Sequence, residues 1–186
     1  TMKDPALVAV EDEFVRKIVT ELKDADNVYY EICNEPYFWG PTEEWQRHMA
    51  SVITETEHKL GVRHLISRNI ANGKAEIKDP DSFISIFNFH YARPPETVKM
   101  NWALSKPIGL NETGFDGPFD APYRIQAWDF LLAGGALYNN LDYSFTVGHE
   151  DGSFGTLATQ PGGGSPKLRS QLRTLIEFFQ GFDFIR

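Results

Sequence analysis

The sequence predicts an α/β fold, a single domain in which helices cover a parallel sheet. Helix-like and strand-like segments alternate five times along the 186 residues, and no hairpin turn signal joins two strand-like segments. Strands joined by helical crossovers run parallel. Each strand-like segment also ends in polar residues, which are expected to gather at one edge of the sheet. The length suits one domain over residues 1–186 and is too short for two ordinary domains.

The first part of the chain predicts helix, strand, helix and strand in turn. Apolar residues recur every three or four positions over 7–22, which predicts a helix packed on one face. The β-branched and aromatic run 28–33 predicts a strand. A second helix is predicted over 41–60, with acidic residues in its first turn, where the helix dipole favours them. The next strand is predicted over 64–69, followed by an irregular polar segment, 72–81.

The second part continues the same alternation. The most strand-like run in the chain, 83–91, predicts a strand, and two further strands are predicted at 107–112 and 136–144. Helices are predicted at 94–104, 122–132 and 166–180. The glycine-rich segment 162–166 is expected to be a loop in which Ser165 is the N-cap of the last helix and Pro166 its first residue.

The composition excludes several functions. The chain has a formal net charge of −8 and no basic stripe, so nucleic acid is not an expected partner. Its single cysteine, Cys33, cannot form an internal disulfide. The longest apolar stretch, around 130–138, is far too short to cross a bilayer, and no membrane partner is expected. The five histidines lack the spacing of zinc ligands, and we predict neither a metal nor another cofactor.

The polar strand ends favour a barrel over a nucleotide-binding sheet, although the alternation alone leaves both open. They fall at Asn34-Glu35, 67–69, His90-Tyr91, Asn111-Glu112 and Asn139-Asn140. In a (β/α) barrel the reactive groups come from the carboxyl ends of several different strands. A nucleotide-binding fold would place a glycine-rich turn after its first strand, and the first strand here ends in Asn-Glu-Pro instead.

Two glutamates occupy equivalent places in this pattern. Glu35 and Glu112 each follow a strand, and they converge if those strands are neighbours across a cleft. A pair of carboxylates is what glycoside hydrolysis requires, one to protonate the leaving oxygen and one to attack or to activate water. The rings of residues 37–39, including Trp39, suit the apolar faces of sugars. The alternatives are that Glu35 is only a helix-cap or loop residue and that the rings only cover the rim of the sheet.

Three segments resemble the clan A glycoside hydrolases, in particular family 5, the cellulase and mannanase family. VYYEICNEP at 28–36 is similar to the fourth strand, where Asn-Glu-Pro carries the acid/base. FNFHYARP at 87–94 is similar to the sixth strand, and KPIGLNETG at 106–114 to the seventh, which ends in the nucleophile. The resemblance implies a (β/α)8 barrel of the TIM type, of which this chain supplies the strands resembling the fourth to the eighth.

The resemblance also implies roles for individual residues. Glu35 is expected to be the acid/base and Glu112 the nucleophile of a retaining reaction, with the two carboxyl groups about 5–5.5 Å apart. Asn34 is expected to bind the sugar 2-hydroxyl, and His90 with Tyr91 to support the nucleophile and the substrate. The resemblance further implies export, to the periplasm or out of the cell.

The sequence departs from the family pattern in three respects. The family separates the His and Tyr of the sixth strand by one residue, whereas His90 and Tyr91 are adjacent, so that only one faces inward unless a bulge intervenes. The tryptophan that commonly ends the eighth strand is absent, and Tyr143 is the ring available in its place. The first three strands, and the arginine that the family places near the nucleophile, have no counterpart.

The missing strands leave two alternatives, either a piece of a longer protein or a sheet closed by a partner. Unpaired strand edges at 28–33 and 136–144 predict self-association into a homo-oligomer. The leading functional hypothesis is a retaining glycoside hydrolase that acts on a β-linked polysaccharide or oligosaccharide. A truncated, non-catalytic carbohydrate-binding or assembly protein is the second, and an unrelated α/β hydrolase or lyase that uses the same two acids is the third.

Overall fold

The computed structural model describes residues 2–155 and 164–184, apart from the side chain of Trp39. The elements follow one another as α1 (Pro5–Glu21), β1 (Tyr29–Glu31), α2 (Pro36–Trp39), α3 (Glu43–Leu60), β2 (Leu65–Asn72), β3 (Ile86–His90), α4 (Glu96–Met100), the short 3-10 helix η1 (Trp102–Leu104), β4 (Ile108–Glu112), α5 (Asp120–Leu132), β5 (Leu137–Tyr138) and α6 (Pro166–Gln180). The predicted α/β class with a parallel sheet is confirmed.

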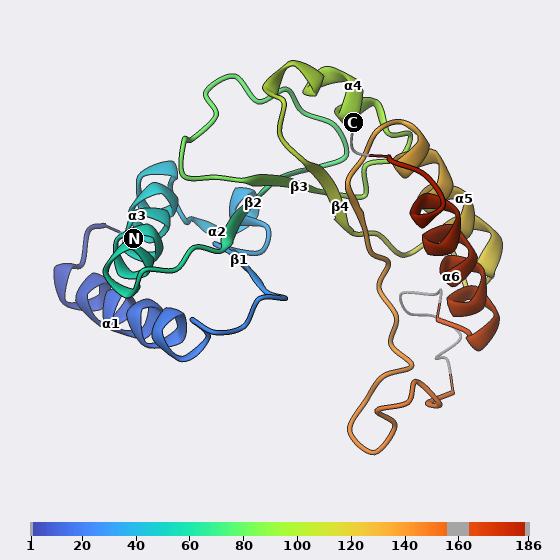
Figure 1. Ribbon diagram of the computed structural model, residues 1–186, viewed down its shortest axis with the longest axis horizontal. Coiled ribbons are helices and arrows are strands. Elements are labelled where there is room, and N and C mark those ends of the chain that lie inside the picture. Colours follow the sequence, from blue (N-terminus) through green and yellow to red (C-terminus); the bar gives the residue numbers. More distant parts are fainter. Residues whose placement is uncertain (1, 156–163, 185–186) are drawn as a thin grey trace.

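The five strands form one parallel sheet in the order β1-β2-β3-β4-β5, so that neighbours in sequence are neighbours in space. The sheet curls as half of a barrel, and the helices follow one another along the outside of the arc (Figure 1). A doubly wound sheet would instead reverse its strand order part-way, and no such reversal is present here. No helix among the described residues is long and apolar enough to cross a membrane.

The sheet has an apolar outer face and a polar inner face. In β3, Phe87 and Phe89 belong to the buried core beneath the helices, whereas Asn88 and His90 alternate with them. Because successive side chains of a strand point to opposite faces, Asn88 and His90 lie on the inner face. The core is completed by buried residues of the neighbouring elements: Val19, Ala50, Ile53, Ile66, Ile84, Ala92, Val98, Ile108, Leu110 and Phe130.

Three long helices begin at side-chain caps. The Oδ1 atom of Asp4 accepts hydrogen bonds at the start of α1, Thr42 Oγ1 accepts the N–H of Trp45 at the start of α3, and Ser165 Oγ accepts the N–H of Leu168 in α6. The predicted roles of Ser165 as N-cap and Pro166 as first helical residue are confirmed. Residues 162 and 163 of the predicted loop lie outside the described part of the chain.

The predicted strand 136–144 is wrong beyond Tyr138. The chain still bonds to β4 and the residue after it through the N–H groups of Asn139 and Leu141, which donate to Leu110 O and Thr113 O at 2.8 Å each, and it then turns away from the sheet. Asp142 Oδ1 accepts the N–H of Ser144 at 2.9 Å, which closes a local turn. This Asx turn competes with strand pairing, and β5 is therefore only two residues long.

Three other predicted segments differ in extent or type. The predicted helix 94–104 divides at Asn101 into α4 and η1. The buried side chain of Asn101 donates a hydrogen bond to Ala75 O and accepts one from the N–H of Ile77. The strand predicted over 83–91 is shorter, beginning at Ile86 and ending at His90. Residues 36–39, between the predicted strand 28–33 and the predicted helix 41–60, form the short helix α2.

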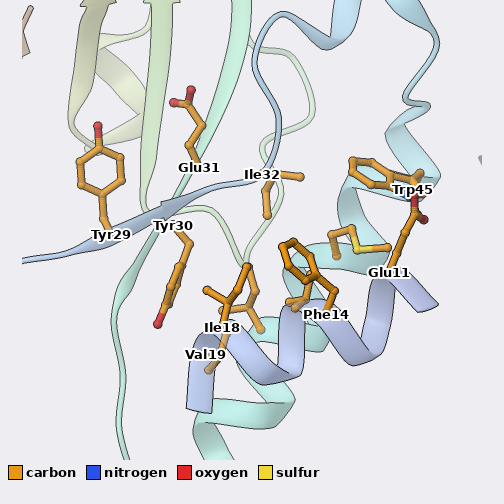
Figure 2. A pocket seen from close by; sticks show the side chains of 12 residues that line it. Glu11, Phe14, Ile18, Val19, Tyr29, Tyr30, Glu31, Ile32 and Trp45 are labelled. Atoms are coloured by element: carbon orange, nitrogen blue, oxygen red, sulfur yellow. Dashed lines mark hydrogen bonds between the residues drawn. The ribbon is translucent and has the colours of Figure 1, made fainter. Parts of the chain in front are cut away.

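The free edge of β1 borders a groove of about 450 Å³ between β1, α1 and α3, here called the edge groove. Its lining includes Phe14, Ile18, Val19, Tyr30, Glu31 and Met49. Figure 2 shows Tyr29 and Glu31 leaving β1 on the side away from α1. The N–H of Ile32 donates to Ser67 O in β2, so the backbone groups of Tyr29 and Glu31, which alternate with it, point to the free edge.

Candidate active site

Four of the predicted site residues come together at the carboxyl ends of β1, β3 and β4. His90 Nδ1 lies 3.1 Å from Glu35 Oε1 and 3.5 Å from Glu112 Oε1. Tyr91 donates its hydroxyl to Glu112 Oε1 at 2.7 Å. We call these four residues the site cluster. His90 is only 1% exposed, whereas the side chains of Glu35 and Glu112 are 23% and 22% exposed, so the two carboxylates remain open to a ligand.

Unusual backbone conformations bring adjacent residues into the site cluster. Glu35 has φ 46° and is the N-cap of α2, and its N–H donates to Asn69 Oδ1 at 3.1 Å. Tyr91 has φ 50°, and its N–H donates to Glu112 O at 2.8 Å. Because the left-handed turn at Tyr91 breaks strand alternation, both His90 and Tyr91 reach the glutamates, which removes the difficulty that their adjacency raised.

A register shift between β3 and β4 likewise lets two adjacent residues of β4, Asn111 and Glu112, both reach the polar groups of the site. Phe89 pairs with Leu110 but His90 pairs with Glu112, so Asn111 is an extra residue in β4. Regular alternation would point Asn111 and Glu112 to opposite faces. With the bulge, the side chain of Asn111 contacts Glu31 on the inner face while that of Glu112 meets His90 and Tyr91.

A second set of polar side chains lies on the inner face next to the site cluster. Glu31 Oε2 accepts hydrogen bonds from Ser67 Oγ at 3.0 Å, from Asn88 Nδ2 at 2.6 Å and from Asn111 Nδ2 at 2.9 Å. These four residues, the inner polar cluster, come from β1, β2, β3 and β4. One carboxylate thus ties four strands together, and it fixes the strand ends that carry the site cluster.

The sequence interpretation missed the inner polar cluster. The available signal was one polar residue near the middle of an otherwise apolar strand, as at Glu31 in YYEIC and Asn88 in FNF. A buried polar group is costly unless it is hydrogen-bonded, so polar residues in several strands indicate a shared network. Arg93 was also missed. Its guanidinium bonds Thr113 Oγ1 and Gly114 O and pairs with Asp116, which holds the loop that follows Glu112.

Burial and the two carboxylates raise the pKa of two neighbouring tyrosines, Tyr37 and Tyr91. Burial raises the pKa of Tyr37 well above its ordinary value, and the charges of Glu35 and Glu112 raise it further. Burial also raises the pKa of Tyr91, and the hydrogen bond to Glu112 and the charge of Glu112 add to this effect. Both phenols therefore stay protonated at neutral pH, and Tyr91 remains a hydrogen-bond donor to Glu112.

Three predicted site residues are not part of the site cluster. Asn34 is exposed, and its side chain makes no hydrogen bond to another described residue. Tyr143 is 50% exposed, in the segment that follows β5. Trp39 ends α2, and its side chain lies outside the described part of the structure; the side chain of its neighbour Phe38 is exposed.

Two further acids lie in the loop that follows β5. Glu150 and Asp151 accept backbone hydrogen bonds from Gly148 and Ser153 within the same turn.

The site cluster also contains a group of potential metal ligands. One oxygen of Glu35, one oxygen of Glu112 and one ring nitrogen of His90 all lie within 4.8 Å of one another. The expected convergence of two acids at one edge of the sheet is therefore present. Two carboxylates and a buried imidazole at this separation can transfer protons, attack an electrophilic carbon or bind a cation.

No protein-family model matches the chain, and no curated protein sequence matches it either.

Proposed function

We propose that the chain is a retaining glycoside hydrolase of the family 5 type and that its curled sheet is part of a (β/α)8 barrel. The proposal is carried by one observation: Glu35 and Glu112, from two different strand ends, approach within 4.8 Å around the buried His90. In retaining enzymes the two carboxyl groups are about 5–5.5 Å apart, whereas inverting enzymes leave room for a water, at about 6.5–9.5 Å. The short separation favours the retaining reaction.

In this proposal Glu112 attacks the anomeric carbon of a β-linked sugar. Glu35 donates its proton to the glycosidic oxygen, the bond to that oxygen breaks, and a glycosyl ester forms on Glu112. Water then attacks the anomeric carbon, Glu35 accepts its proton, and the Glu112 carboxylate is released. The donor hydrogen bond from Tyr91 holds Glu112 Oε1, and His90 Nδ1 lies within hydrogen-bond distance of Glu35 Oε1.

The substrate proposed is a β-linked polysaccharide or oligosaccharide. Tyr37 and Phe38 are exposed beside Glu35, with ring centroids 4.9 Å apart, and such rings can stack on the apolar faces of sugars. Asn34 is exposed next to Glu35 and is proposed to bind the 2-hydroxyl. Tyr143 is proposed as a more distant sugar contact. These assignments imply a protein that meets polysaccharides after export from the cell.

Turnover of activated aryl β-cellobiosides and aryl β-mannobiosides tests this proposal. We expect Glu112→Ala to abolish turnover, and Glu35→Ala to slow cleavage of poor leaving groups by about 10²–10⁴-fold, the usual contribution of a general acid. Azide separates the two roles. In Glu112→Ala it fills the space of the lost carboxylate and should give a glycosyl azide of inverted configuration, whereas in Glu35→Ala it should give the retained one.

Glu150→Gln is the matched control, because Glu150 is an exposed acid in a loop. It should leave turnover unchanged. Binding of cello- or manno-oligosaccharides by the unmutated protein without any turnover would reject the enzyme and favour the non-catalytic carbohydrate-binding alternative. Turnover that survives Glu112→Ala would reject the assigned nucleophile.

We also propose that two copies associate along their free sheet edges, with β5 and α6 of one copy beside β1 and α1 of the other. Exposed apolar side chains line both ends of the arc: Leu7, Val10 and Phe14 of α1, and Ile176 and Phe178 of α6. The charges are complementary, since α1 is net acidic and α6 is net basic. The charged residues are Glu11, Asp12, Glu13, Arg16, Lys17 and Glu21 in α1, and Lys167, Arg169, Arg173 and Glu177 in α6.

A further inference from the structure

We propose that Glu35, His90 and Glu112 bind a zinc ion that blocks the active site. The inhibition rests on the function proposed above, whereas the binding rests only on the three side chains. Free zinc would then switch off hydrolysis reversibly, by occupying the oxygens that donate the proton and attack the sugar.

The ligand geometry fits zinc. With Zn–N and Zn–O bonds of 2.0–2.1 Å, the ligand atoms of a tetrahedral site are about 3.3 Å apart. His90 Nδ1 lies 3.1 Å from Glu35 Oε1 and 3.5 Å from Glu112 Oε1, close to that value. The third separation, between the two carboxylates, is within 4.8 Å and closes with a small rotation of either partly exposed side chain. The ion would sit between three protein ligands, with the fourth position open to water.

The local charge provides a second, independent observation. Two carboxylates face each other here, and within residues 2–155 and 164–184 no lysine or arginine pairs with Glu35 or Glu112. Arg93 is near, but its guanidinium pairs with Asp116 at 2.7 Å. A divalent cation bound by both carboxylates would supply the positive charge that no lysine or arginine provides here. Tyr91 already holds Glu112 by a hydrogen bond of 2.7 Å, and such bonds to a ligating carboxylate strengthen metal binding.

Zinc fits better than magnesium because of the imidazole. Magnesium demands six near-ideal oxygen ligands, whereas zinc accepts nitrogen and oxygen in a four-coordinate site. No metal-ligand spacing is visible in the sequence, because the three ligands come from the ends of three strands, at positions 35, 90 and 112. They meet only when β1, β3 and β4 are assembled.

Calorimetric titration of the folded protein with zinc sulfate in chelator-free buffer tests the site. One zinc ion per chain should bind, and magnesium sulfate should give no heat. His90→Gln and Glu112→Gln should each weaken zinc binding by more than about tenfold, since even outer-shell partners contribute 10–100-fold. His149→Gln is the matched control, because His149 lies in the loop after β5, where its ring bonds Ser153, and it should leave binding unchanged.

An activity assay separates this inference from the proposed function. Zinc should raise KM for an aryl glycoside without lowering kcat, and a chelator should restore the original KM. Zinc binding that His90→Gln abolishes supports the site even if no glycoside is turned over. Turnover with no zinc binding overturns the inference, as does zinc binding that persists undiminished in both His90→Gln and Glu112→Gln.

Discussion

At the scale of single residues, the site cluster depends on two residues whose backbone conformation is rare for any residue other than glycine. Glu35 and Tyr91 both have positive φ, at 46° and 50°. Such conformations cost about 1–3 kcal/mol each and persist where the surroundings hold them. Here Asn69 accepts the N–H of Glu35, and the carbonyl of Glu112 accepts that of Tyr91. The strain is thus located at the residues proposed to act on substrate.

Removing the hydroxyl of Tyr91 should impair catalysis with little effect on folding. Tyr91→Phe keeps the ring and loses the 2.7 Å hydrogen bond to Glu112. A hydrogen bond to a charged group contributes about 1.5–3 kcal/mol, so we expect kcat/KM for an aryl glycoside to fall about 10–100-fold. Tyr138→Phe is the control: it removes a hydrogen bond to Tyr123 O away from the site cluster and should leave kcat/KM unchanged. Equal kinetics in the two variants would contradict the role of Tyr91.

Alkaline titration should show that several tyrosines ionise only on unfolding. Burial raises the pKa of Tyr37, Tyr91 and Tyr138 in the folded chain above the unfolded value of about 10. Above about pH 10 the folded state therefore holds more protons than the unfolded state, and the contribution of these tyrosines to stability, fully present below that pH, is lost as the pH rises further. Phenolate absorbance during a pH titration, with circular dichroism to follow folding, checks this. Complete ionisation of all seven tyrosines in a chain that is still folded would contradict it.

At the scale of helices and strands, long periodic segments could be predicted and short ones could not. The helices predicted over 7–22 and 41–60 correspond to α1 and α3, because each has a wide apolar face. Residues 136–144 look like a strand but give only β5, because local turn bonds of Asp142 override the β propensity.

The same distinction applies to the site. Glu35, His90, Tyr91 and Glu112 could be predicted to lie at strand ends, since chain position determines which edge of a parallel sheet they reach. The partners of Glu31 could not be predicted, because they depend on strand register. The bulge at Asn111 likewise leaves no mark in the sequence.

Close packing between β3 and β4 leaves no room for a side chain at Gly109. A Cβ atom at this position would lie 2.0 Å from Asn88 Oδ1 and 3.2 Å from Leu137 Cδ2. Asn88 is fully buried and bonded to Glu31, so it cannot move without breaking the inner polar cluster. We expect Gly109→Ala to lower the free energy of unfolding by about 1–3 kcal/mol, as overpacking does, measured by urea unfolding. Gly155→Ala, with open space around it, should have no such effect. Equal stability of the two variants would contradict this account.

At the scale of the whole molecule, the sheet is half of a barrel whose two edge strands, β1 and β5, each have one side without a partner strand among the described residues. The backbone groups of Tyr29 and Glu31 point to the free edge of β1, and β5 ends the sheet on the other side (Figure 1). Unpaired strand edges favour pairing with another chain. The site cluster lies between these edges, at the ends of β1, β3 and β4, so a second copy that pairs with these edges would face the site cluster.

Blocking the free edge of β1 should therefore reduce self-association. Tyr29→Pro removes a backbone N–H that points away from β2 and so should leave the β1–β2 pairing intact. Sedimentation velocity over a range of concentrations should show dimers of the unmutated chain and of Tyr29→Phe, and monomers of Tyr29→Pro. Added salt should weaken the dimer, because it screens α1 from α6. A monomeric unmutated chain, or a Tyr29→Pro variant that dimerises equally well, would contradict the proposal.

The sequential strand order has a consequence for biosynthesis. Each strand pairs with the one made just before it, so a growing chain can add βα units one at a time as they leave the ribosome. Glu35, which follows β1, is synthesised before His90 and Glu112, which lie at the ends of β3 and β4. The site cluster is therefore complete only once β4 has been made, and a chain released before β4 would hold Glu35 and His90 without Glu112.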